Sequence, residues 1–297
     1  MKKLKRKLKD YTRDFLRVFL SPEKYIKLRF YLTHKYKLNL KNPKTWNEKI
    51  QYRKLYGDHE LYAQYVDKYL VREKIKEIIG EEYLIPHIAK FEQIKPNDID
   101  SLPNSFVIKT SNGGGGENVK IVKDKLNLNK EKLCKEFNKY IKIRNGKKTD
   151  EPFYDVNHPV IIIEKLILDS ESKLPNDYKF HCFNQEENIK IIVGVDTGRF
   201  ENHCRNFYDE NWNLMDLKIA KKNTNLEIEK PKNFDLMIDI VKKLSRNFEY
   251  SRIDMYNVNG KIYFGEITFC HGSGYEKLSY EWDLKMGKMW NKNPINS

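Results

Sequence analysis

Residues 106–122 read FVIKTSNGGGGENVKIV, and this stretch decides how the rest of the sequence is interpreted. The apolar runs 106–108 and 119–122 predict two short strands. Glycine backbone can approach an anion closely, and Lys109 on the first strand would point a cation into the same space. We interpret the stretch as a hairpin that closes over the phosphates of a nucleotide, with a flexible surface hairpin as the alternative. The loop of this hairpin holds Gly113, Gly114, Gly115 and Gly116.

The hairpin differs from two familiar phosphate-binding motifs. It lacks the Gly-Lys-Ser/Thr ending and the following helix of a P-loop, and it lacks the strand-to-helix setting of a dinucleotide fingerprint. A mobile lid over a nucleotide therefore fits the pattern better than either motif.

Composition indicates a folded protein of one large or two ordinary domains. The chain has 297 residues, of which 39% are hydrophobic and 13% aromatic, and this excludes a disordered chain. No apolar run reaches the length of a membrane span, and no signal peptide is expected. The cysteines form no CxxC pair, which favours reduced cytosolic thiols and gives no zinc signature. They are Cys134, Cys182, Cys204 and Cys270.

The net charge of +14 is concentrated at the N-terminus. Residues 1–41 hold 14 Lys and Arg and three acids, so only +3 remains for the other 256 residues. Apolar residues at helical spacing over 4–19 predict a basic amphipathic helix. Three interpretations stay open: a helix docked on the main body, contact with an anionic membrane surface, and nucleic-acid binding. No nucleic-acid reader motif accompanies the basic run, so we expect no nucleic-acid partner.

The first half of the chain is predicted to be mainly helical. Residues 43–78 form two helices, the second of which carries Lys68, and residues 83–86 follow as a short strand. Residues 97–104 are expected to be a loop, and residues 128–143 a helix. The polar stretch 145–158 is expected to be a mobile connection.

A carboxylate ends the buried strand predicted over residues 160–167. Glu164 directly follows four aliphatic residues, and a lone buried charge is costly, so this side chain needs a partner. It is either a strand-end acid turned to solvent or an acceptor for an adenine amino group.

The C-terminal third contains strands over 177–183 and 189–195, a helix over 234–248 and a hairpin over 251–268. Asn259-Gly260 is its predicted turn, which makes Asp254 and Glu266 close cross-strand neighbours. Like charges facing each other destabilise a sheet unless something compensates, and Mg²⁺ is commonly held by one or two carboxylates. Two solvent-facing acids beside Arg252 are the alternative.

In this order, the motifs resemble the ATP-grasp superfamily of carboxylate–amine ligases, and most closely its teichuronopeptide-biosynthesis (TupA-like) branch. The resemblance spans roughly residues 40–290. It rests on the amino-acid sequences of residues 41–49, 177–180 and 257–266, together with the glycine hairpin. It implies an α+β ATP-grasp fold in which two subdomains clasp ATP. The expected segments are a basic helical region over 1–40, an N-terminal portion with the lid over 41–165, and a C-terminal subdomain with the metal site over 166–297.

The resemblance also assigns roles residue by residue. Lys68 and Lys109 match the lysines that hold ATP phosphates, beneath the glycine lid. The adenine hinge matches Glu164, Lys165 and Ile167. The cations near the transferred phosphoryl group match Lys179 and Arg252. The ligands for two Mg²⁺ ions match Asp254, Glu266 and Thr268, with Glu266 as the bridge; Thr268 stands where most relatives have Asn.

The implied activity is that of an ATP- and Mg²⁺-dependent amide ligase. A uronic-acid-type carboxylate and an amine would be joined through an acyl phosphate, on a cell-surface polysaccharide of capsule, teichuronic or lipopolysaccharide type or on its precursor. We expect a cytoplasmic enzyme whose residues 1–20 contact an anionic membrane or polysaccharide at the inner face of the plasma membrane. The alternatives are a glycosyltransferase or phosphotransferase of the same pathway and a non-enzymatic polyanion-binding protein. A glycosyltransferase would typically show a short Asp-x-Asp run, and this chain has only Asp98-Ile99-Asp100 in a polar loop, which we interpret as a chance match.

Overall fold

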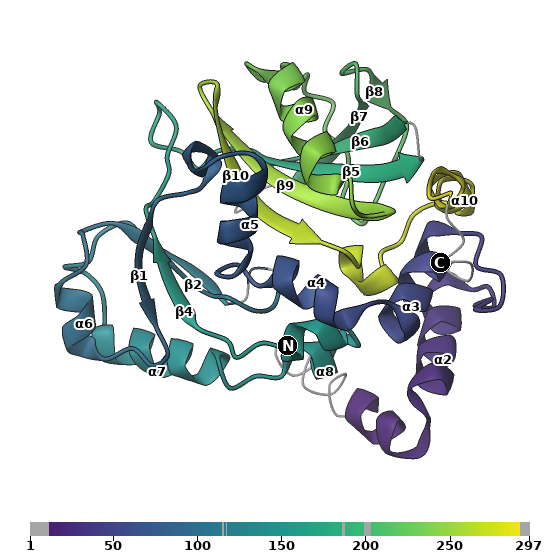
Figure 1. The fold of residues 1–297 in the computed structure, drawn as a ribbon, viewed down its shortest axis with the longest axis horizontal. Helices are drawn as coiled ribbons and strands as arrows, with labels where there is room; N and C mark the ends of the chain where they lie inside the picture. The colour runs from purple at the N-terminus through teal and green to yellow at the C-terminus, as the bar shows by residue number, and fades with distance from the viewer. Residues whose placement is uncertain (1–11, 115, 117, 186–187, 199–202, 292–297) are drawn as a thin grey trace.

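Two antiparallel sheets form the framework of the molecule, as the α+β prediction requires (Figure 1). The computed structural model describes residues 12–114, 116, 118–185, 188–198 and 203–291. The four-stranded sheet has the order β1-β4-β2-β3, and the six-stranded sheet has the order β10-β9-β5-β6-β7-β8. The strands are β1 (His87–Phe91), β2 (Phe106–Thr110), β3 (Val119–Val122), β4 (Ile161–Glu164), β5 (Asp177–Gln185), β6 (Asn188–Thr197), β7 (Cys204–Asp209), β8 (Leu214–Met215), β9 (Tyr250–Val258) and β10 (Lys261–Thr268).

The helices surround and connect these sheets. Figure 1 shows α6 and α7 along the lower edge of the four-stranded sheet and α9 above the six-stranded sheet. A first described helix covers residues 12–19. The other α-helices are α2 (Pro22–His34), α3 (Trp46–Tyr56), α4 (His59–Val66), α5 (Val71–Ile78), α6 (Pro96–Asp100), α7 (Lys130–Tyr140), α8 (Asn145–Thr149), α9 (Phe234–Ser245) and α10 (Tyr280–Met289).

Each sheet has its own apolar core. Leu133 and Phe137 of α7 are buried together with Ile108 of β2 and Ile163 of β4. The larger core contains residues of β5, β6 and β9 and the inner face of α9. Because side chains alternate across a strand, the residues of β5 that point away from α9 form a second, polar face. This polar face includes Asp177, Lys179 and His181.

Both hairpins predicted from the sequence are present, and the second has an irregularity in register between Phe264 and Glu266. In β2–β3, Lys109 pairs with Val119, and β4 lies on the other side of β2. In β9–β10, Asp254 is the direct cross-strand partner of Glu266. Asn259 and Gly260 both have positive φ, 54° and 94°, as the predicted two-residue turn requires.

Several predicted elements differ from the observed ones. The helix expected around Lys68 breaks, and this lysine lies in a turn between α4 and α5. The cause is Asp67, whose buried side chain accepts from the backbone N–H groups of Tyr69 and Leu70 and from the hydroxyl of Ser111. A side chain that bonds nearby backbone in this way competes with the helix.

The other differences concern short elements. The strand predicted over 83–86 is partly the 3₁₀ turn Glu81–Tyr83, and the strand itself begins at His87. The loop predicted over 97–104 contains α6, which Pro96 starts. The connection predicted over 145–158 is ordered into α8 and the 3₁₀ helix η2 (Pro152–Asp155), because Asp155 accepts from the N–H groups of Gly146 and Lys147. The helix predicted over residues 4–19 agrees with the observed helix over 12–19. The part of this prediction that covers residues 4–11 lies outside the described residues.

Within the described ranges, no helix is long and apolar enough to cross a membrane.

Candidate functional site

One end of the candidate site is a buried ion-pair cluster in the four-stranded sheet. Lys109 on β2 and Glu164 on β4 lie on adjacent strands, and Lys109 Nζ is 2.6 Å from Glu164 Oε2. Arg72 of α5 approaches the other carboxylate oxygen at 3.5 Å. Glu164 is only 4% exposed, so it is not turned to solvent. Two cations thus neutralise one acid, and a positive charge remains at this end.

The glycine loop and Lys68 are close in sequence to members of this cluster. The loop follows Lys109, and Lys68 precedes Arg72 by four residues. Lys68 Nζ donates to the carbonyl of Gly113 at 2.6 Å, and its backbone N–H donates to the carbonyl of Ser111. Gly113 has a φ of 80°, which favours glycine. Gly115 lies outside the described residues.

The segment of α8 and η2 packs beneath this loop. A side chain added at Gly113 would meet the amide of Asn145 at 2.8 Å, and one at Gly114 would meet the hydroxyl of Tyr154 at 3.9 Å. The missing side chain at Gly113 therefore allows the loop to lie close to Asn145, whereas a side chain at Gly114 would make only an ordinary contact.

The other end of the site is centred on Arg252 of β9. Its Nε donates to Asp254 Oδ1 at 2.6 Å, and its Nη2 donates to Asp254 Oδ2 at 2.7 Å and to Glu266 Oε1 at 2.9 Å. Lys68 Nζ lies 3.5 Å from the other Glu266 oxygen. The two acids that the sequence pairs across the hairpin are therefore joined by one guanidinium and connected through Lys68 to the glycine loop.

Lys179 of β5 lies on the same polar face. Its Nζ is 2.7 Å from both Asp177 Oδ2 and Asp254 Oδ2, and 3.9 Å from Asp196 Oδ2. Burial alone would lower the pKa of Lys179, but the Asp177 and Asp254 carboxylates outweigh it and raise that pKa. Burial would likewise raise the pKa of Asp254, but Arg252 and Lys179 hold it below its usual range. Both groups are therefore charged at neutral pH.

A further chain of contacts extends from Arg252 beyond the strand end. Arg252 Nη1 lies 2.5 Å from His271 Nδ1, and His271 Nε2 lies 2.8 Å from Glu276 Oε2. Because an arginine can only donate, Nδ1 must accept and Nε2–H must donate to the carboxylate. Burial lowers the pKa of His271, which agrees with a neutral imidazole. His271 therefore fixes the orientation of the guanidinium.

Glu276 connects this chain to Arg205. Its carboxylate is 3.9 Å from Arg205 Nη1, and Arg205 forms a two-pronged pair with Asp196 at 2.5 and 3.0 Å. Burial would raise the pKa of Glu276, but His271 and Arg205 lower it to about 2. The sequence does not single out Asp196 or Glu276, because no local pattern predicts these contacts.

A buried acid also lies at the loop after β10. Glu151 accepts a hydrogen bond from the hydroxyl of Ser273, and the amino group of Lys54 donates to the Ser273 carbonyl at 3.1 Å. Burial raises the pKa of Glu151 to about 7 and lowers the pKa of Lys54 to about 8. Neither residue was predicted, since both lie in segments without a motif.

The donor set at Asp254 and Glu266 fits a magnesium ion in its chemistry. Two carboxylates on paired strands supply the hard oxygen ligands that Mg²⁺ prefers, and Glu266 is partly exposed. Thr268 is on the same side of β10 as Glu266, two residues on, and pairs with Arg252. In the described part of the chain no three His, Cys, Asp or Glu side chains gather closely enough to hold a metal by themselves. Water and substrate phosphates would therefore have to complete the coordination.

The remaining predicted residues lie apart from these contacts. Lys165 is exposed, and its backbone N–H donates to the carbonyl of Pro86 at 3.0 Å, while Ile167 is half-buried. Among the described residues no ion pair joins the Lys109–Glu164 pair to the Arg252 group. In α6, Asp98 accepts from the N–H of Lys95 and Asp100 pairs with Lys130, so the Asp-x-Asp run has structural partners away from the site.

Comparison with known proteins identifies one matching family. A family model described as TupA-like ATPgrasp matches residues 48–291. No curated protein matches the chain.

Among solved structures, D-alanine-D-alanine ligase from Helicobacter pylori is 16% identical with a TM-score of 0.45, and the match covers 78% of this chain and 62% of that one. N5-carboxyaminoimidazole synthetase from Staphylococcus aureus, complexed with ADP, is 15% identical with a TM-score of 0.40, at 70% and 46% coverage. This chain thus spans less than two thirds of either protein. With such low TM-scores, neither structure adds to what the family model shows.

Proposed function

Because this chain belongs to the TupA-like ATP-grasp family, we propose that it is an ATP- and Mg²⁺-dependent carboxylate–amine ligase. The observation that carries the proposal is the Arg252 group. One guanidinium joins the cross-strand pair Asp254 and Glu266, and Lys68 connects Glu266 to the glycine loop. This arrangement brings carboxylates for a metal next to cations and backbone that suit phosphates.

In the proposed reaction a substrate carboxylate oxygen attacks the γ-phosphorus of ATP, and the bond to the β-phosphate oxygen breaks to release ADP. An amine then attacks the acyl carbon, phosphate leaves, and the nitrogen loses a proton to give the amide. When bound by Asp254, Glu266 and Thr268, one or two Mg²⁺ ions would supply charge neutralisation at the phosphate oxygens. The other groups that carry out these steps belong to the chain itself.

Lys68 and Lys109 are assigned to the phosphates, and Arg252 to the charge that develops on the transferred phosphoryl group. Lys179 faces the same carboxylate, Asp254, and is assigned to the acyl phosphate. The loop Gly113–Gly116 would cover the phosphates and exclude water from the acyl phosphate. Glu164 would accept from the adenine amino group, and the backbone around Lys165 and Ile167 would meet the ring edge.

The proposed substrates are a uronic-acid-type carboxylate and an amine on a cell-surface polysaccharide or its precursor. Family membership supports this class, and the basic N-terminal region suits an anionic polymer. Contact of residues 1–20 with polysaccharide or with an anionic membrane would place a cytoplasmic enzyme at the inner face of the plasma membrane.

The test is release of ADP from ATP in a screen of uronic acids against amines. Hydroxylamine is included as a parallel nucleophile because it converts an acyl phosphate into a coloured hydroxamate. The proposal predicts ADP and hydroxamate only when a carboxylate is present, and loss of both in Glu266→Gln but not in the exposed control Glu281→Gln. Turnover of a sugar nucleotide without ATP consumption would contradict it and favour a glycosyltransferase.

A further inference from the structure

A second basic region lies on α7 and α8. Residues 130–148 hold eight Lys and Arg and two acids, so the rest of the chain beyond residue 41 has more acids than bases. Lys132, Lys135 and Lys139 are exposed and recur at helical spacing, while Leu133 and Phe137 on the other side of α7 are buried. The lysines therefore form one stripe on the solvent face of the helix.

The N-terminal helices add exposed apolar side chains. In the helix over 12–19, Phe15, Val18 and Phe19 are 63%, 77% and 71% exposed, whereas Leu16 and Leu20 pack against the small core formed with α2. Side chains so large and so exposed, three on one helical face, are a liability in water unless something covers them.

Helix α2 repeats the same pattern. Its exposed stripe has an apolar centre and a lysine at each end, and it consists of Lys24, Leu28, Tyr31, Leu32 and Lys35. Lysines in such positions can extend toward headgroups while the apolar residues between them enter a less polar layer.

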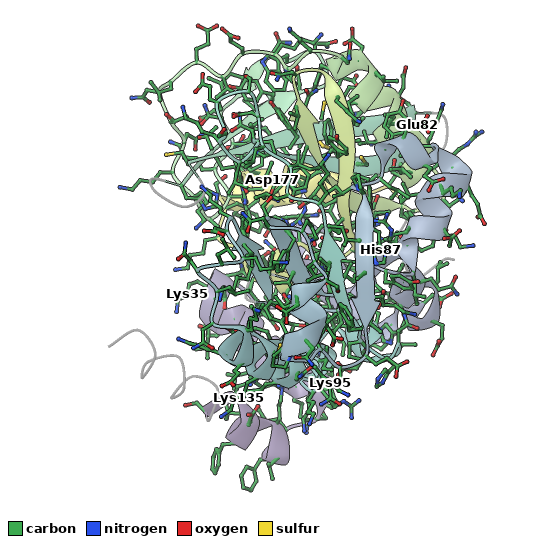
Figure 2. The ribbon with its side chains drawn as sticks, turned by 90° about the vertical axis from the view of Figure 1, so that its left-hand side faces the viewer. Lys35, Glu82, His87, Lys95, Lys135 and Asp177 are labelled. Carbon is green, nitrogen blue, oxygen red and sulfur yellow. The ribbon has the colours of Figure 1, made fainter. Side chains whose placement is uncertain are left out.

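One residue joins these two regions. Asp150, which follows α8, forms ion pairs with Arg17 of the first helix and with Arg29 of α2, the latter at 3.2 Å. Figure 1 shows α2, α7 and α8 along the lower part of the molecule, and Figure 2, turned about the vertical axis, shows Lys95 and Lys135 in that lower part as well. We call the surface of the helix over 12–19, α2, α7 and α8 the lower face.

We propose that the lower face binds the surface of an anionic lipid bilayer. The lysines of α7 and α2 would attract acidic headgroups, and Phe15, Val18 and Phe19 would enter the region between headgroups and acyl chains. An anionic polysaccharide would satisfy the lysines, but it offers no apolar layer for the exposed Phe and Val side chains. The apolar residues therefore decide between the two kinds of partner.

The lower face adjoins one end of the candidate site. His34 Nε2 of α2 lies 3.0 Å from the carbonyl of Gly274, and the Arg29 guanidinium lies 3.7 Å from the centre of the Tyr275 ring. Both contacts hold the loop that follows Thr268 and carries His271. The inference rests on the membrane contact proposed above for residues 1–20 and deepens it by adding α2 and α7 to the binding surface; binding itself requires no turnover.

The test is sedimentation of the full chain with vesicles of phosphatidylcholine, with and without about a third of phosphatidylglycerol. The apolar variant is Phe15→Ser/Val18→Ser/Phe19→Ser, and its control changes two exposed leucines elsewhere, Leu214→Ser/Leu226→Ser. The charge variant is Lys132→Gln/Lys135→Gln/Lys139→Gln, and its control changes exposed lysines outside the lower face, Lys218→Gln/Lys243→Gln/Lys261→Gln.

The wild type is expected to bind the anionic vesicles and not the neutral ones. Each lower-face variant should weaken that binding at least ~10-fold, and each control less than ~2-fold. Thermal melting of every variant shows whether it is folded. Failure of the wild type to bind anionic vesicles, or equal losses in variants and controls, would overturn the inference. Retention on polygalacturonate with no vesicle binding would assign the face to a polysaccharide instead. Ligase activity in solution does not enter any of these outcomes, so the two proposals fail separately.

Discussion

The two ends of the candidate site carry opposite excess charge. In the four-stranded sheet one acid, Glu164, faces two cations, Lys109 and Arg72. On the polar face of the six-stranded sheet, five acids are connected with four cations. These acids are Asp177, Asp196, Asp254, Glu266 and Glu276, and the cations are Lys68, Lys179, Arg205 and Arg252.

The difference in charge suggests that the two ends bind different parts of a ligand. An excess of positive charge suits phosphate, and an excess of negative charge suits a divalent cation. Lys68 contacts both the glycine loop and Glu266, so it lies where the two would meet. A magnesium–nucleotide complex would satisfy both ends at once, which neither phosphate nor metal would do alone.

The largest effect is expected from breaking the negative end. Glu266→Gln removes the more exposed of the two paired carboxylates, and we expect ligation to slow at least ~10²-fold, the usual cost of losing one electrostatic group in an active site. Folding should change little, because Glu266 is 28% exposed and leaves Arg252 its two bonds to Asp254. Steady-state rates at saturating Mg²⁺ measure the effect. A rate within about threefold of wild type would show that this carboxylate is not part of the active site.

Breaking the positive end should affect stability as well as rate. Lys109→Met leaves Glu164 buried with only the distant Arg72, and removing one partner of a buried pair costs about 3–5 kcal/mol. The double variant Lys109→Met/Glu164→Gln removes the stranded charge and should recover a large part of this loss, without recovering activity. Urea unfolding of these two variants and of the single variant Glu164→Gln measures the recovery and the coupling. If the two destabilisations simply add, the pair is not coupled.

A smaller effect, on the pH dependence of stability, is expected from Glu151, which contacts the loop after β10 beside the negative end. The pKa of Glu151 is raised from 4.5 to about 7, so between these values the folded protein keeps a proton that the unfolded chain releases. Its contribution therefore lowers the free energy of unfolding as pH rises from 4.5 to 7, by about 3 kcal/mol in total. Glu151→Gln should remove this decline, while the exposed Glu281→Gln should leave it unchanged. Urea unfolding across this pH range measures both slopes, and a decline that persists in Glu151→Gln would rule out Glu151 as its source.

The sequence predicts those parts of the site that depend on local geometry. The Asn259-Gly260 turn predicts that Asp254 and Glu266 lie close together across the β9–β10 hairpin, and an irregularity at Gly265, which the sequence did not predict, makes them direct partners. The aliphatic run before Glu164 indicates that this acid needs a partner, and the structure shows it buried beside Lys109. The family resemblance adds the fold class and a branch that the family model confirms.

What the sequence could not predict depends on contacts between distant segments. The break at Asp67 requires the hydroxyl of Ser111, 44 residues away, and the order of residues 145–155 depends partly on the contact of Glu151 with Ser273. The net charge beyond residue 41 does not reveal the second basic region, because acids elsewhere in the chain balance its charge. Such contacts leave no periodic or local pattern.

The most direct test of the two-ended site is thermal stabilisation by ATP with and without Mg²⁺, in wild type, Glu266→Gln and Glu281→Gln. At about a hundred times its dissociation constant, a ligand adds about 2.7 kcal/mol of stability, enough to detect. ATP alone should stabilise all three proteins, and Mg²⁺ should add to this in wild type and Glu281→Gln but not in Glu266→Gln. No stabilisation by ATP, or the same Mg²⁺ increment in all three, would contradict the account.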